Sequence, residues 1–232
     1  MRFVRKGPEP AELRRWKRDN SGIWGRKAFD QLDASAKGAT REQLLAEQGH
    51  LCAYTMMRIG GDERVHIEHI RSQRRYPDLT VDCGNMLACA SGNGAVVYAF
   101  GGAAKGDADV SADTFVSPLH PSCEVRFRYS SQGEIDAADP SDAAASATIK
   151  LLNLRDKYLV ALRRQVLVEI TLGSGKRRPL SPSKARRLAE QANQPDASGR
   201  LPAFCIAIQQ VATKIADRQE KLARRLANRK DR

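Results

Sequence analysis

The residues of this chain best suited to chemistry are Glu68 and His69, which lie side by side in the apolar, strand-like run 65–70. Asn85 stands at the start of a second apolar run, 85–90. A carboxylate can hold a divalent cation, an adjacent imidazole can take a proton from water, and an amide can fix the orientation of the imidazole. These side chains are what a one-metal site for phosphodiester cleavage needs. The alternative is an exposed, salt-bridged strand whose histidine has no chemical role.

Neighbouring residues on a strand point to opposite faces of the sheet, and this limits how Glu68 and His69 can act together. They can converge on one phosphate only where the strand is bent or bulged, so we expect a bend or bulge there. His66 lies two positions before Glu68 and shares its strand face. It has two interpretations, an additional metal ligand or a structural side chain.

The charge of the chain favours a polyanionic partner. Its 232 residues carry a formal net charge of +12, which is typical of proteins that bind nucleic acid, with an anionic membrane surface as the alternative. The sequence has no apolar run of spanning length and no signal-peptide core at its start. We therefore expect a cytoplasmic protein that binds DNA and no membrane. The five cysteines are scattered, which predicts reduced thiols or metal ligands rather than disulfides.

The pattern of apolar residues predicts an α+β fold. A first helix is expected over 10–18, with Leu13 and Trp16 on one face. A second helix opens with a capping box at 40–43 and ends at Gly49.

The middle of the chain is predicted to hold the strands that position the candidate residues. The runs 65–70 and 85–90 are separated by an irregular basic loop, 71–82. The segment 91–113 is poor in large apolar residues, which predicts a loop with at most a short helix. Alternation of apolar and polar residues within 125–136 predicts a hairpin.

The rest of the chain is predicted to be helical. Ser141 can cap the first of these helices, and Ser181-Pro182 suits the start of the third. The expected spans are 141–152, 156–172, a helix from 181 onward and 201–229, with a basic linker at 173–179. We therefore divide the chain into a region 1–139 that carries the candidate site and a helical C-terminal region 140–232.

Several short blocks of the sequence agree, in their order, with one known family. The blocks are 1–13, 51–54, 67–70, 74–77, 84–88, 105–107, 121–127 and 148–154. They resemble the PtuB-type HNH endonucleases of Septu and some retron anti-phage systems, and the resemblance covers about residues 1–165. It implies an HNH, or ββα-metal, nuclease that hydrolyses DNA with a divalent metal ion, Mg²⁺ or Mn²⁺. It also implies a PtuA-type ATPase partner and, in retron systems, a reverse transcriptase with its single-stranded DNA.

The resemblance assigns roles to individual residues. It implies that His69 is the general base, Glu68 the acidic metal ligand beside it and Asn85 the asparagine that orients the histidine. The second metal ligand falls on Asn93, which offers a donor oxygen. An alignment anchored on the block 105–107 places it instead on Gly102, which has no side chain to offer.

Four basic side chains are expected to bind nucleic acid. Arg71, Arg74 and Arg75 follow the candidate strand and could contact phosphates that position the scissile strand, although an ordinary solvated loop is the alternative. Lys105 is added on the resemblance of its block.

Such nucleases usually contain a zinc ribbon built from two Cys-x-x-Cys pairs. Here the first pair keeps Cys52 but has Thr55 in its second position. The second pair keeps Cys89 and has Gly92, or Gly101 on the other alignment, in place of its partner. Two thiols cannot close a four-ligand site, so we expect the structural zinc to be absent.

Two further hypotheses stay open. Loss of the ribbon cysteines, unless Cys83 or His66 replaces them, favours a degenerate HNH domain that binds nucleic acid or acts as a scaffold for the ATPase. A toxin-type RNase would use the same chemistry. The helical C-terminal region, with the basic N-terminal arm, is expected to dock the ATPase. Because 173–176 lacks the residues of a phosphate-binding loop, any ATP dependence is expected to come from that partner chain.

Overall fold

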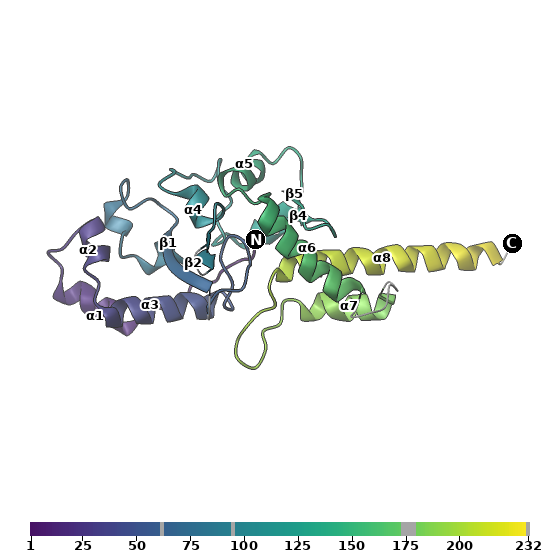
Figure 1. Ribbon diagram of the computed structural model, residues 1–232, viewed down its shortest axis with the longest axis horizontal. Coiled ribbons are helices and arrows are strands. Elements are labelled where there is room, and N and C mark those ends of the chain that lie inside the picture. The colour runs from purple at the N-terminus through teal and green to yellow at the C-terminus, as the bar shows by residue number, and fades with distance from the viewer. Residues whose placement is uncertain (61–62, 94–95, 173–179, 231–232) are drawn as a thin grey trace.

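The computed structural model describes residues 1–60, 63–93, 96–172 and 180–230, and it has the predicted α+β fold (Figure 1). Its elements are α1 (Ala11–Asp19), α2 (Arg26–Asp30), α3 (Ala34–Glu47), β1 (Glu63–His69), β2 (Met86–Asn93), β3 (Val96–Val97), α4 (Gly102–Lys105), β4 (Phe127–Tyr129), β5 (Ile135–Ala137), α5 (Ala143–Leu151), α6 (Lys157–Leu172), α7 (Pro182–Gln191) and α8 (Cys205–Lys230), with 3₁₀ turns at η1 (Pro77–Leu79), η2 (Cys83–Asn85) and η3 (Pro121–Arg126). None of the helices within the described ranges has the length and apolar character needed to cross a bilayer.

The strand pair β1–β2 is antiparallel, and β3 adds to the free edge of β2. The register of β1 runs without a shift from Val65 to His69, and its irregularity lies between Arg64 and Val65. The bulge predicted at Glu68 and His69 is therefore wrong in position. Instead, His69 is the last residue of β1, so the strand ends where the bulge was expected.

The sheet reaches further along the chain than the sequence predicted. Residues 91–93 belong to β2 and Val96–Val97 form β3, although a loop was expected there. Pairing of backbone groups does not require large apolar side chains, which explains the difference. Gly92 is needed for this pairing, because a Cβ at that position would lie 2.2 Å from the Val96 carbonyl oxygen. The expected short helix is present as α4.

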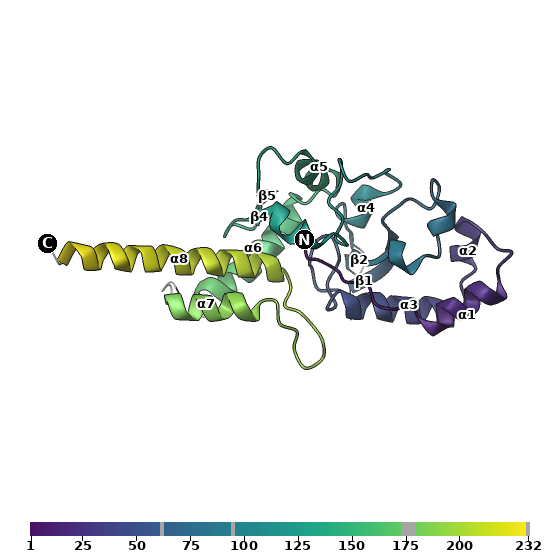
Figure 2. The same ribbon diagram turned by 180° about the vertical axis from the view of Figure 1, so that it is seen from behind.

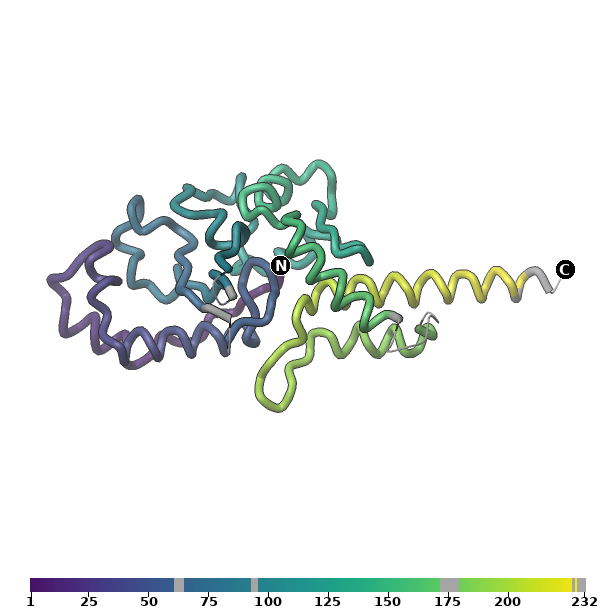
Figure 3. The backbone as a smooth tube through the Cα atoms, in the orientation of Figure 1, coloured from purple at the N-terminus to yellow at the C-terminus, as the bar shows by residue number. Residues whose placement is uncertain are grey.

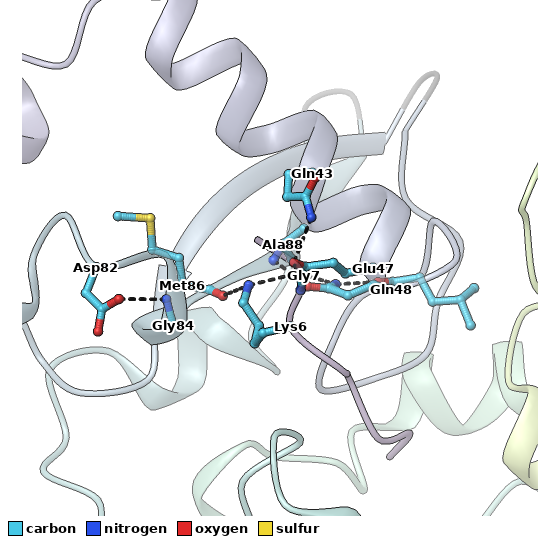
Figure 4. A network of polar contacts seen from close by, with 10 residues as sticks. Lys6, Gly7, Gln43, Glu47, Gln48, Asp82, Gly84, Met86 and Ala88 are labelled. Atoms are coloured by element: carbon cyan, nitrogen blue, oxygen red, sulfur yellow. Dashed lines mark hydrogen bonds and ion pairs between the residues drawn. The ribbon is translucent and has the colours of Figure 1, made fainter. Parts of the chain in front are cut away.

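Both sides of β2 are covered by helices, since α3 and α4 each contact it. Figure 4 shows how the α3 side is fixed. The buried Gln48 amide donates to the carbonyls of Leu51 and Ala88, each at 2.7 Å, and its oxygen accepts from the Ala88 backbone N–H at 2.8 Å. Lys6 joins Glu47 at 2.6 Å and donates to the Met86 carbonyl at 3.3 Å. These contacts hold β2, and with it the strand pair, against α3.

The helix starts differ from prediction where a different side chain supplies the cap. The α3 helix begins at Ala34 because Asp33 accepts from the Ala36 N–H at 2.7 Å, and Thr40 lies inside the helix. The capping box at 40–43 is therefore wrong. Asp142, rather than Ser141, caps α5.

Other helix predictions are confirmed. The α1 helix buries Leu13 and Trp16, and Ser181 caps α7. The α8 helix begins at Cys205, because Leu201 is used in a loop where its N–H donates to the Gly49 carbonyl at 3.0 Å. The hairpin is confirmed as β4–β5, although 125–126 belong to the preceding 3₁₀ turn.

Hydrogen bonds and apolar contacts join the two predicted regions, 1–139 and 140–232. The boundary between them at 139/140 stays a prediction. The Tyr129 N–H donates to the Gln210 side-chain oxygen at 2.9 Å, and the Phe204 N–H donates to the Met56 carbonyl at 2.9 Å. The hydrophobic core is one cluster that includes side chains from both regions. The far part of α8 extends past the end of α7 and away from the strands (Figures 2 and 3). The basic linker 173–179 lies outside the described residues.

Candidate functional site

A polar cleft of about 350 Å³ lies at the end of β1. Glu68 and His69 both line it, and so do Gln73 from the following loop, Asp107 after α4, and Arg26 at the start of α2. The structure thus brings the two candidate residues to one cavity, and it does so at the end of a strand rather than at a bulge.

The His69 imidazole is held by hydrogen bonds on both ring nitrogens. Its Nε2 lies 2.8 Å from the Thr80 carbonyl oxygen, which can only accept, so Nε2 carries the hydrogen. The Gln73 side-chain nitrogen lies 2.9 Å from Nδ1, to which it can donate, and 3.2 Å from Nε2. The edge of the ring packs against Phe29, with centroids 4.8 Å apart. Burial lowers the pKa of His69, so the ring is neutral at pH 7 and Nδ1 can act as a proton acceptor.

Asn85 acts on His69 through the backbone of the loop between them. Its Oδ1 accepts from the Arg71 N–H at 2.8 Å, and its Nδ2 donates to the carbonyls of Arg71 at 3.1 Å and Leu79 at 3.2 Å. These bonds tie the start of the loop to the residue just before Thr80. Asn85 was predicted to hold the imidazole, and the structure shows that its amide instead fixes the loop that carries the Thr80 carbonyl.

The Glu68 side chain is 11% exposed, and its carboxylate is engaged on both oxygens. Its Oε1 lies 2.8 Å from the Lys105 ammonium, and its Oε2 lies 3.2 Å from His66 Nε2. The Lys105 side chain is itself only 1% exposed. The structure therefore places Lys105 inside the site, paired with Glu68, and not on the surface where it was predicted to contact nucleic acid.

The two alignments for the second metal ligand fall in different places. The backbone of Asn93 lies six residues along β2 from Leu87, the partner of Glu68, which is roughly 20 Å in an extended strand. The Asn93 side chain is outside the described residues. Gly102 lies directly against the site, since a Cβ on it would be 2.9 Å from Glu68 Oε2 and 3.0 Å from His66 Nε2. The structure brings Gly102 to Glu68 and does not bring Asn93 there.

The remnants of the ribbon also come together. Cys52 and Cys89 are buried and hydrogen-bonded to each other, and Cys52 also bonds to Thr55. A Cβ on Gly101 would lie 3.4 Å from Thr55 Cγ2, which places Gly101 next to this group, whereas Gly92 packs against β3.

The pKa values of the two buried thiols are shifted in opposite directions. Burial raises the pKa of Cys52, but hydrogen bonds from Cys89, Thr55 and the backbone outweigh it and bring the value to about 6. Burial raises the pKa of Cys89 well above its ordinary range. Within the described ranges, no three His, Cys, Asp or Glu side chains form a group that could hold a metal ion. This finding does not test for zinc, and its expected absence stays a prediction.

The arginines after β1 divide into one structural and two exposed side chains. The Arg71 guanidinium donates to the Val110 carbonyl and lies over the Tyr76 ring, 5.2 Å from its centroid. Arg74 is exposed, and Arg75 is an exposed side chain that pairs with Asp109 at 3.3 Å. Phosphate contact by Arg74 and Arg75 stays a prediction, while Arg71 stabilises the loop.

Sequence reasoning missed the parts of the site that come from tertiary structure. Gln73 and Thr80 lie in an irregular loop, where no spacing marks them as partners of a histidine. The pairing of Lys105 with Glu68 joins residues far apart in the chain. His66 was noticed because it lies two positions from Glu68, but its proximity to Gly102 was not foreseen.

Compared with known proteins, the chain matches no family model and no curated protein sequence. The resemblance to PtuB-type nucleases therefore rests on the residues that carry it, and the function is inferred from the site.

Proposed function

We propose that this protein is a metal-dependent HNH endonuclease that hydrolyses phosphodiester bonds in DNA. The observation that carries the proposal is the state of His69. It is a buried, neutral imidazole whose Nε2–H is fixed by the Thr80 carbonyl and whose basic Nδ1 lies at a polar cleft shared with Glu68. That is the arrangement of a general base beside an acidic metal ligand.

The order of elements around the cleft supports the proposal. His69 ends β1, Asn85 lies just before β2, and Gly102 opens α4, which packs on β2. Two antiparallel strands and a helix, with the base on the first strand and the asparagine at the second, are the arrangement that a ββα-metal element implies.

The geometry of Glu68 and His66 fits a divalent metal ion. Two ligand atoms at ~2.1 Å from one metal lie ~3.0 Å apart in octahedral geometry and ~3.4 Å apart in tetrahedral geometry. Glu68 Oε2 and His66 Nε2 are 3.2 Å apart, joined in this structure by a hydrogen bond that a bound ion would replace. Lys105 occupies only Oε1 and leaves Oε2 for this role. A divalent ion held there would stabilise negative charge on the phosphate and the leaving oxygen.

The residues of the chain supply the proton transfer and the positioning. Nδ1 of His69 takes the proton of the attacking water once the Gln73 amide gives up its bond to that nitrogen. The Thr80 carbonyl accepts the Nε2–H throughout and stabilises the imidazolium that forms. Asn85 keeps that carbonyl in place. The exposed Arg74 and the net charge of +12 attract the DNA backbone.

We place the protein in the cytoplasm as the effector of an anti-phage complex with a PtuA-type ATPase and, in a retron system, with the reverse transcriptase and its single-stranded DNA. The far part of α8 supports such docking, because Leu222 and Leu226 are 57% and 52% exposed there. Large apolar side chains on an exposed helix are typical of an interaction surface. The identity of the partner as a PtuA-type ATPase comes from the resemblance to PtuB-type nucleases and not from this surface.

A degenerate, non-cleaving HNH domain is the second candidate, and two contacts favour it. Gly102 offers no ligand, and a buried ammonium already neutralises Glu68. In that case the protein would bind nucleic acid or act as a scaffold in the same complex.

Nicking of supercoiled plasmid by Glu68→Ala and His69→Ala, over a range of Mg²⁺ and Mn²⁺ concentrations, tests the proposal. Glu68→Ala should lose activity through metal affinity, so high metal concentrations should restore part of it. His69→Ala should stay inactive at every concentration, since it lacks the proton acceptor. If metal restores both variants equally, or if the wild-type protein nicks equally well in EDTA, the division of roles proposed here is wrong.

A further inference from the structure

The space in front of Gly102 is filled by another residue of the site. A Cβ on Gly102 would lie 3.0 Å from Nε2 and 3.1 Å from Cε1 of His66, as well as 2.9 Å from Glu68 Oε2. These separations are shorter than ordinary van der Waals contact. A side chain on residue 102 would therefore begin in tight contact with the His66 imidazole, which would have to give by a few tenths of an ångström, and Glu68 Oε2 would have to shift.

His66 reaches this place because of its position on β1. It lies two residues before Glu68, so both side chains leave the same face of the strand. Its Nε2 faces the carboxylate oxygen that Lys105 does not use. His66 on β1 thus places its Nε2 close to the point where the side chain of a larger residue at position 102 of α4 would lie.

We infer that His66 replaces the missing ligand at position 102, so that Glu68 and His66 together bind the metal ion. This inference rests on the proposed function and names the donors of its metal site. Imidazole suits Mn²⁺, Co²⁺, Ni²⁺ and Zn²⁺ better than Mg²⁺, which prefers oxygen ligands and keeps its water molecules. The site therefore prefers these transition metals to Mg²⁺.

Binding of Mn²⁺ to the full-length protein tests this without reference to activity. Titration calorimetry with MnCl₂ gives the affinity, and pulsed electron paramagnetic resonance detects the coupling of a bound imidazole nitrogen to the ion. The wild-type protein should show both binding and nitrogen coupling, and it should bind Mn²⁺ more tightly than Mg²⁺. His66→Gln, which keeps most of the side-chain volume, should lose the coupling and weaken binding by at least the ~10–100-fold seen for partners outside the metal's own ligands.

A ligand swap provides the matched control. In the double variant His66→Ala, Gly102→His the obstructing ring is gone, and only the flexible end of Glu68 has to shift. This variant should regain both the affinity and the nitrogen coupling. Gly102→His alone should gain no affinity, because His66 still occupies the space. His69→Ala should keep the coupling, since the proposal uses that ring as a proton acceptor and not as a metal ligand.

The results separate the inference from the proposed function. If Glu68→Ala loses Mn²⁺ binding while His66→Gln keeps both its affinity and its nitrogen coupling, His66 is not a ligand and the inference is overturned, with the Glu68 site left standing. If Glu68→Ala binds Mn²⁺ as tightly as the wild type, the metal site of the proposed function fails as well. Circular dichroism of each variant identifies any that are unfolded. If His66→Gln is unfolded, the double variant His66→Ala, Gly102→His decides instead. Nitrogen coupling in that variant supports the inference, and its absence overturns it.

Discussion

Replacement of Asn85 by alanine tests whether a clamped loop positions the general base. The asparagine is 5% exposed, and its side chain makes three hydrogen bonds, to Arg71 N–H, Arg71 O and Leu79 O. Each bond contributes ~0.5–1.5 kcal/mol net, so Asn85→Ala should lower the free energy of unfolding by about 3 kcal/mol. Urea unfolding followed by circular dichroism measures this loss.

The same substitution should reduce cleavage more than stability alone explains. With the loop released, the Thr80 carbonyl no longer fixes His69, and loss of such an outer partner typically costs ~10–100-fold in activity. The loss should fall on kcat rather than KM at temperatures where the variant is folded. Because a looser ring is better hydrated, the pKa of His69 should also rise toward its ordinary value, and the acid limb of the pH profile should move with it.

Asn193→Ala is the matched control for this prediction. Asn193 makes one side-chain hydrogen bond, to Gln209 at 2.7 Å, in the α7–α8 region. The control should cost ~1 kcal/mol and leave kcat and the pH profile unchanged. If Asn85→Ala cleaves at the wild-type rate while folded, or if its pH profile does not move, the positioning role of the loop is refuted.

Three further predictions follow from the same structure. Burial lowers the pKa of His69, so the rate of DNA cleavage should rise with pH through an inflection below 6.5 and be level at neutral pH; an inflection above 6.5 in a pH–rate profile would contradict the neutral, buried base. Elemental analysis of dialysed protein should find well under one zinc per chain, because the ribbon keeps only Cys52 and Cys89; a stoichiometric zinc that survives dialysis would show that other ligands complete the site. Leu222→Glu with Leu226→Glu should abolish co-purification with a co-expressed PtuA-type ATPase while Val97→Glu, at an exposed apolar residue of β3, does not; equal recovery of both variants would remove α8 as the docking surface.

The local elements of the fold could be predicted because their signals are local. The strand through Glu68 is marked by its apolar run, α1 by Leu13 and Trp16, and the start of α7 by Ser181-Pro182. The predicted helix starts were wrong where two polar residues could each serve as the N-cap. Thr40 has the right spacing for a capping box, but Asp33 accepts from the Ala36 N–H and caps the helix about two turns earlier.

The site itself was predictable only in part. The types and spacing of Glu68, His69 and Asn85 indicated the chemistry, and the structure brings the first two to one cleft. The partners that set their states come from other elements, as Lys105 on α4 and Thr80 in the loop show. Such contacts depend on how the elements pack, which one-dimensional spacing does not contain.

Cleavage and binding of plasmid DNA, measured side by side, test the central claim most directly. With Mn²⁺ the wild-type protein should nick supercoiled plasmid and EDTA should stop it, while His69→Ala should bind the DNA with unchanged affinity and cleave it ~10²–10⁴-fold more slowly. If the folded wild-type protein binds the plasmid but nicks it with no divalent metal, alone or with the ATPase, or if His69→Ala cleaves at the wild-type rate, His69 is not the general base of a nuclease.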